Sequence, residues 1–163
     1  MKTVELMHVL QEFYRDKLTT YNRHVAAARQ VSDYEFNNTY QYVIAREDVQ
    51  LAWLRDAILD LGGTPDDAVQ LETAPSGRGE ADVQRSVFAR DSDEAERFVD
   101  KWRPRLDAVT HARHRNMLRV ILGETLEHKR FFDQALAGRT DLLGRRADGA
   151  GTGGGVLPTR WVE

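Results

Sequence analysis

The sequence predicts an all-α fold, a bundle of four amphipathic helices. Apolar residues recur at helical spacing over four long stretches, and no stretch alternates with the period of two that is typical of a strand. The only four prolines stand at residues 65, 75, 104 and 158, which leaves the first sixty residues free of proline. A chain of 163 residues, 41% hydrophobic and 30% charged, is typical of one globular domain.

The first sixty residues are expected to form two long helices. Residues 3–31 carry one continuous apolar stripe, and Ser32 or Asp33 can cap a second helix, with Glu35 as the capping-box partner of Ser32. Gly62 ends the second stripe. Each helix of about 28 residues is about 42 Å long. Because only one or two residues join them, they should form an antiparallel hairpin.

The third helix is expected to follow a long connection. Residues 62–80 have turn chemistry at both ends and are numerous enough to cross the length of a bundle. The third helix should run over residues 80–102, with an interruption near residues 90–92. Pro104 is expected to break the pattern.

The fourth helix is expected to begin at a cap formed by Asp107 and to end near Ala137, where Gly138 stops it. Residues 1–140 therefore make the bundle domain, and residues 141–163 make a tail with five glycines between positions 149 and 155. The plain interpretation is a loosely packed terminus. Alternatively, residues 156–163, which contain Trp161, dock on a protein partner.

Composition and charge exclude several classes of function. The formal net charge is −3, and this near-balance argues against nucleic acid or an anionic membrane as a partner. The absence of cysteine excludes disulfides, thiolate metal sites and cysteine nucleophiles. Without a long apolar run or an apolar leader, we expect no membrane contact and a cytoplasmic location.

Three stretches carry a family resemblance: residues 17–24 (Lys-Leu-Thr-Thr-Tyr-Asn-Arg-His), residues 44–63 and residues 115–128. Within the last, Ile-Leu-Gly-Glu-Thr-Leu-Glu-His spans residues 121–128. They resemble helices of bacterioferritin and rubrerythrin-type proteins, members of the ferritin-like superfamily. The resemblance covers about residues 3–138 and implies a ferritin-like antiparallel four-helix bundle with a long crossover between helices 2 and 3.

In that superfamily, six side chains hold two metal ions in the bundle. They are a glutamate from the first and third helices and a Glu-x-x-His pair from the second and fourth. Such a site activates oxygen or oxidises ferrous iron. At those positions this sequence has, in chain order, Lys17, Glu47, Gln50, Ser92 (or a neighbour among Asp91, Asp93 and Glu94), Thr125 and His128. Only Glu47 and His128 keep the ligand types.

Lys17 is the most informative of these replacements. An ammonium group in the middle of the bundle repels a metal ion and supplies the positive charge that Glu47 would otherwise lack. We therefore expect a metal-free polar cluster of Lys17, Glu47, Gln50, Thr125 and His128 and no cofactor. The protein would then be a binding or interaction module. Haem is not expected either, because Asp48 occupies the position of the methionine that ligates haem in bacterioferritins.

The alternative is a di-metal oxidoreductase or iron-handling protein with shifted ligands. Glu124, Glu127 and His128 could form a half-site for iron or manganese, bridged by Glu47. The plainer interpretation leaves Glu124 and Glu127 exposed to solvent. His24 shares no recognisable ligand spacing and receives no role. Whether the protein is an enzyme stays open at this level.

Two further expectations concern partners. Tyr42, Val49 and Trp53 form a stripe on the second helix opposite Glu47 and predict a homodimer, since ferritin-like bundles commonly pair through the outer faces of helices 1 and 2. A flexible linker followed by a short apolar peptide, as in residues 149–163, also resembles the ends of ferritin-like cargo proteins of encapsulin shells. The residues from Val156 to Glu163 do not match the usual targeting sequence of those proteins.

Overall fold

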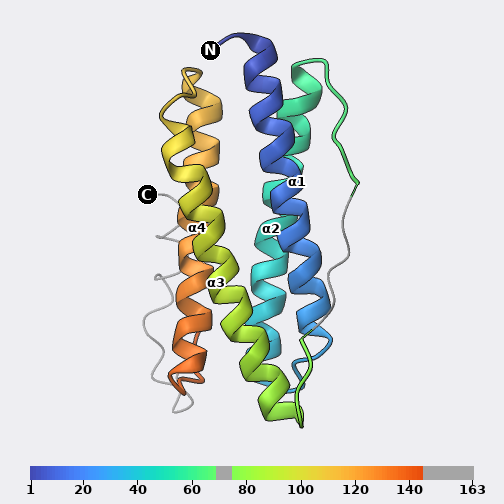
Figure 1. The fold of residues 1–163 in the computed structure, drawn as a ribbon, viewed down its shortest axis with the longest axis vertical. Coiled ribbons are helices and arrows are strands. Elements are labelled where there is room, and N and C mark those ends of the chain that lie inside the picture. Colours follow the sequence, from blue (N-terminus) through green and yellow to red (C-terminus); the bar gives the residue numbers. More distant parts are fainter. Residues whose placement is uncertain (69–74, 145–163) are drawn as a thin grey trace.

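Four helices build the molecule. The computed structural model describes residues 1–68 and 75–144, and in these residues every regular element is an α-helix. The helices are α1 (Thr3–Ala28), α2 (Tyr34–Asp60), α3 (Glu80–Leu106) and α4 (Ala112–Leu136). Figure 1 shows them lying side by side along one long axis. The prediction of an all-α bundle of four helices is confirmed.

The most extensive helix contacts are those of α1 with α2 and of α3 with α4. In Figure 1, α2 ends at the upper end of the bundle and α3 begins at the lower end, so residues 61–79 must connect opposite ends. After α4, Leu142 is buried in the core, which means that core contacts continue past residue 140. The docking peptide expected at residues 156–163 lies outside the described residues.

The cap of α2 is formed by Asp33. Its carboxylate accepts hydrogen bonds from the backbone N–H of Glu35 and of Phe36, at 3.0 Å and 3.1 Å. The alternative cap, a box of Ser32 with Glu35, does not form, because the Ser32 hydroxyl donates to the Glu80 carboxylate instead. Residues 29–33 lie outside both helices, so five residues rather than the expected one or two join α1 to α2, and α1 ends at Ala28, three residues earlier than expected.

The glycine stops behave as expected. Gly62 and Gly138 follow the ends of α2 and α4 with φ of 82° and 87°, a left-handed conformation that residues with a Cβ adopt only at a cost. The following backbone N–H groups, those of Gly63 and Arg139, donate back to carbonyls of the last helical turn. These bonds satisfy acceptors that a helix end otherwise leaves open.

The expected interruption of α3 is wrong, because the helix runs unbroken through residues 90–92 and past Pro104. Asp91 and Ser92 are buried and bonded to side chains of other helices, so burial of these polar residues does not disrupt the helix. Pro104 removes one hydrogen bond within the last turn only. Trp102 and Leu106, buried four residues apart on one face, hold that turn against the core.

The expected start of α4 at Asp107 is also wrong. Residues 107–111 form a connection, and α4 begins at Ala112 with His111 at its N-cap position. Val109 explains the difference, because this fully buried residue turns into the core between the two helices. Asp107 instead forms an exposed ion pair with Arg119 at 3.4 Å.

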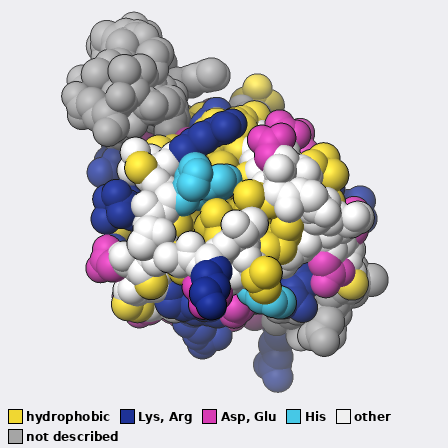
Figure 2. All heavy atoms as spheres, turned by 90° about the horizontal axis from the view of Figure 1, so that it is seen from above, with side chains coloured by type: hydrophobic (Ala, Val, Ile, Leu, Met, Phe, Trp, Pro, Cys, Tyr) yellow, Lys and Arg dark blue, Asp and Glu magenta, His cyan; other side chains and the backbone are white. Residues whose placement is uncertain are grey.

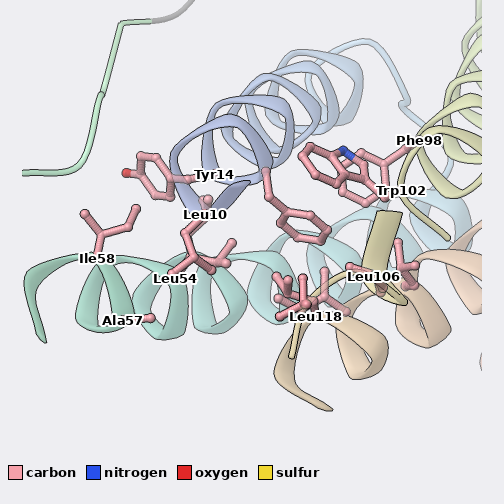
Figure 3. Packing of buried hydrophobic residues seen from close by; sticks show 14 of the residues in the cluster. Leu10, Tyr14, Leu54, Ala57, Ile58, Phe98, Trp102, Leu106 and Leu118 are labelled. Atoms are coloured by element: carbon pink, nitrogen blue, oxygen red, sulfur yellow. The ribbon is translucent and has the colours of Figure 1, made fainter. Parts of the chain in front are cut away.

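The core consists of two apolar clusters separated along the bundle. The first lies at the upper end, where Figure 3 shows large side chains from all four helices meeting around Leu10, Leu54, Trp102 and Leu118. Seen from above, hydrophobic side chains gather at the centre of this end, with charged groups around them (Figure 2). The second cluster packs the helices together at the other end, around Tyr40, Phe88 and Phe132. Polar side chains fill the space between the clusters.

No described helix combines the length and the apolar character needed to cross a membrane.

Candidate functional site

The candidate site is the polar layer that separates the two apolar clusters. All four helices contribute to it, and its members are less than a tenth exposed. Burial of this many polar groups is unusual, since charged side chains are rarely fully buried without partners. The layer contains Lys17, Thr20, Arg23 and His24 from α1, Glu47 and Gln50 from α2, Asp91 and Ser92 from α3, and Glu124, Thr125 and His128 from α4.

Glu47 lies at the centre of this polar layer. One carboxylate oxygen forms an ion pair with the Lys17 ammonium at 2.9 Å, and both side chains are shielded from solvent. The other oxygen accepts a short hydrogen bond from Nδ1–H of His24. Lys17 also donates to the Thr125 hydroxyl at 3.4 Å. The structure therefore brings together three residues of the expected cluster, Lys17, Glu47 and Thr125.

The ionised form of Glu47 is stabilised by these partners. Burial alone raises the pKa of the carboxyl group, because desolvation disfavours charge. The attraction of His24 and then of Lys17 outweighs burial and holds the pKa of Glu47 well below its ordinary value. Glu47 is thus a carboxylate whose charge is compensated inside the protein.

Glu124 is buried in the structure, so the expectation that it faces solvent is wrong. Arg46 donates to one of its oxygens at 2.7 Å, and the side-chain amide of Gln50 donates to the other. Helix α2 supplies both donors. Their hydrogen bonds replace those that the Glu124 carboxylate would make with water, which explains why Glu124 can be buried facing α2. Gln50 therefore belongs to Glu124 rather than to the Lys17–Glu47 pair.

Asp91 is the third buried carboxylate of the described residues. It accepts a hydrogen bond of 2.5 Å from the Tyr40 hydroxyl, and Arg90 approaches it at 3.2 Å. Burial and the neighbouring negative charge raise the pKa of Tyr40 well above its ordinary value, so the phenol stays a donor. Each of the three carboxylates that the bundle buries thus has a side-chain cation of its own.

His128 differs from its neighbours. Its ring is buried between Tyr42 and Phe131, and neither ring nitrogen has a hydrogen-bond partner. Burial is the largest cause that lowers its pKa, and Lys17 and His24 add to it against the attraction of Glu47; the pKa falls to about 3. The imidazole is therefore neutral at pH 7. It is a buried polar group whose hydrogen-bonding capacity is unused.

The residues of the shifted metal site are dispersed over different partners. Glu47 pairs with Lys17, Glu124 pairs with Arg46, and Glu127 is only half-buried. Within residues 1–68 and 75–144, no three histidine, aspartate or glutamate side chains are arranged to hold one metal ion. A metal at this layer would require these ion pairs to open.

Comparison of the chain with family models, curated proteins and solved structures finds no match.

Sequence reasoning missed His24 and left Asp91 as one of three alternatives to Ser92. His24 follows Lys17 by seven residues, which places both on the same helix face two turns apart, and that spacing could have identified it. Asp91 was one of several candidates for the third-helix position. Its partner Tyr40 stands seven residues before Glu47 and thus shares the inward face of α2.

The stripe expected at a dimer interface lies at the edge between α2 and α4. Tyr42 contacts the rings of His128 and Phe131, and the Trp53 ring stacks on Arg46. Both are half-buried, whereas Val49 is 38% exposed. The stripe therefore borders α4 rather than α1.

Proposed function

We propose that this protein is a ferritin-like bundle in which internally paired charges take the place of a di-metal centre, and that it acts as a binding or interaction module. The observation that carries the proposal is the ion pair of Lys17 with Glu47, 2.9 Å apart and fully buried. An ammonium group fixed at this distance already neutralises the carboxylate that a cation would need. The Lys17 amine also donates a hydrogen bond to the Thr125 hydroxyl of α4, which holds it in place.

The charges of the whole layer support the same interpretation. Arg46 and Arg90 neutralise the other two buried carboxylates, Glu124 and Asp91. Two divalent ions carry four positive charges, and a di-metal site balances them with several carboxylates that have no other cationic partner. Here metal entry must displace three cations from low-dielectric surroundings, which costs several kcal/mol for each charge left unpaired.

The arrangement of the helices supports the ferritin-like part of the proposal. Contacts between α2 and α4 occur in reversed order along the two helices, from Tyr42 with Phe131 to Gln50 with Glu124. This order is that of antiparallel neighbours. A connection that joins opposite ends of the bundle between α2 and α3 is the other feature of this architecture.

The test is metal content with a charge-restoring variant. Protein purified in iron- and manganese-replete medium should contain much less than one metal ion per chain, and Fe²⁺ or Mn²⁺ should leave its thermal midpoint unchanged. Lys17→Glu should bind Mn²⁺ more tightly by at least tenfold, because it exchanges a cation for a carboxylate beside Glu47. The matched control is Lys2→Glu, the same exchange at an exposed residue.

Near-stoichiometric metal in the unaltered chain that is lost in Glu47→Gln would overturn the proposal. If Lys17→Glu does not fold, the metal content and thermal midpoint of the unaltered chain still decide the question.

One observation favours a second candidate, an iron- or manganese-dependent oxidoreductase with relocated ligands. His128 is neutral, buried and without a hydrogen-bond partner at either nitrogen, so the lone pair of its unprotonated nitrogen is free to bind a metal ion. Anomalous scattering between Glu47 and His128 in crystals soaked with Mn²⁺ would support this candidate. Metal found only at surface carboxylates would count against it.

A further inference from the structure

The edge between α2 and α4 carries an open groove close to the upper end of the bundle. It has a volume of about 410 Å³, and its lining includes Trp53, Ala57 and Asp56 from α2 with Arg113, Met117 and Val120 from α4. Val120 is 46% exposed, and Val49, one turn before Trp53 on α2, is 38% exposed. Each of the two helices therefore places one exposed valine at or next to the groove.

Opposite charges flank the groove. Asp56 lies on the α2 side and Arg113 on the α4 side, and neither forms an ion pair with another described residue. The two helices are level at this point, since Ala57 and Trp53 share the groove with His114 and Met117. The surface thus has an acidic and a basic border at the same height of the bundle.

Gly123, which follows Val120 by about one turn, adds a second feature to the exposed side of α4. It lies in the middle of α4 on the exposed side, and a Cβ at this position would meet nothing within 4 Å beyond its chain neighbours and the backbone of its own helix. Glycine inside a helix is destabilising relative to alanine, and no contact among the described residues requires it here. Gly123 leaves α4 unusually accessible to the backbone of another helix.

We propose that this face, defined by Val49, Trp53, Asp56, Arg113, Val120 and Gly123, is the interface with a second copy of the chain. The copies are related by a two-fold axis parallel to the helices. Such an axis keeps each residue at its height and lays α2 of one copy over α4 of the other. Asp56 then meets Arg113 of the partner subunit.

The same operation brings apolar groups together. Val49 precedes Gln50, which is bonded to Glu124, so Val49 is level with Gly123 and close to the level of Val120. In the dimer, Val49 of each copy would fit against the space that the partner's Gly123 leaves open. The charge pattern and the apolar pattern therefore agree on one geometry.

The area available is sufficient. Helices of 27 and 25 residues are about 40 Å long, and two helices each about 10 Å wide offer roughly 800 Å² per partner. This is the standard size of a specific interface. The inference concerns the outer surface only and does not depend on whether the polar layer holds a metal.

The first experiment measures mass by light scattering on the full chain. The unaltered protein should have twice the 18.6 kDa of one chain. Val49→Asp and Val120→Asp should weaken the dimer at least tenfold, because each buries a carboxylate in the interface. Leu59→Asp is the matched control, an exposed apolar residue of α2 outside the groove, and it should leave the mass unchanged.

The second experiment tests the geometry by exchange of charges. Asp56→Arg and Arg113→Asp should each be monomeric, because like charges then face one another across the two-fold axis. A mixture of the two variants should form a heterodimer, since opposite charges face one another again at both contacts. A monomeric unaltered chain, a dimer that survives both valine variants, or two charge variants that fail to associate when mixed would each overturn the proposal.

Discussion

The ends of the bundle and its middle are held together by different forces. At the upper end, the rings of Phe13 and Trp102 meet edge to face with centroids 4.8 Å apart, among leucines from all four helices. In the middle, the same helices meet through paired charges such as Lys17 with Glu47. Apolar burial stabilises without strict direction, whereas a buried charge stabilises only while its partner is present.

This difference teaches what the polar layer contributes. Two apolar clusters are enough to bring four helices together, because each contains large side chains that are nearly inaccessible to solvent. The ion pairs between them are worth little relative to apolar residues of the same volume, but they are costly to break singly. The layer thus penalises any shift of one helix along another.

The largest effect is expected from removing one charge of the central pair. Lys17→Met keeps the length of the side chain and leaves Glu47 buried with His24 as its remaining partner, which should lower the free energy of unfolding by about 3–5 kcal/mol. Urea unfolding followed by circular dichroism measures this loss. Arg15→Met, an exposed residue of the same helix, is the control and should change stability by less than about 1 kcal/mol.

The double variant Lys17→Met/Glu47→Leu sharpens the comparison. Because it makes the middle resemble the apolar ends, it should recover most of the loss of the single variant. A double variant as unstable as Lys17→Met would show that the pair is not the unit of stabilisation.

A smaller effect is expected at the border between the layer and the lower cluster. Tyr40→Phe keeps the ring against Phe132 but removes the hydroxyl that donates to Asp91, and it should cost about 1.5–3 kcal/mol. Tyr34→Phe is the same substitution at a residue that is 75% exposed and should be neutral. Equal unfolding midpoints for the two variants would contradict the importance of this bond.

The smallest effect is a dependence on pH that originates at His128. Its pKa in the folded state is about 3, against an ordinary value of 6.5, so between these values the unfolded chain binds a proton that the folded chain does not. The contribution of the neutral His128 to the free energy of unfolding is therefore fully present above about pH 6.5. It is lost as the pH is lowered, and at pH 5.5 the free energy of unfolding is lower by about 1.4 kcal/mol. Protonation of Glu47 lowers the free energy of unfolding only at a lower pH, since the pKa of its carboxyl group is depressed below the ordinary value of 4.5.

His128→Leu should remove this part of the dependence. Unfolding free energies at pH 7.5 and pH 5.5 should differ by about 1.4 kcal/mol less in the variant than in the unaltered chain. His8→Leu, at an exposed position, is the control and should keep the full difference. A His128→Leu variant with an unchanged difference would mean that the buried imidazole does not govern stability in this range.

Much of this architecture could be predicted, because helical periodicity and glycine stops are local properties. The ends of α2 and α4 at Gly62 and Gly138 follow from backbone conformation alone. The start of α4 could not be predicted in the same way, because the burial of Val109 overrides the capping preference of Asp107. The closeness of Lys17 and Glu47 could be foreseen because both occupy positions that the family resemblance places on the inward faces of the first two helices.

The sequence alone determined that the chain forms four helices and that a charged group lies on the inward face of two of them. Only the tertiary structure decided which charges meet. Glu124 is buried because Arg46 and Gln50 reach it from α2, and His24 acquires a role because Glu47 lies opposite. The energy of a buried charge depends on atoms a few ångströms away that are distant in sequence, and spacing along one helix does not contain that information.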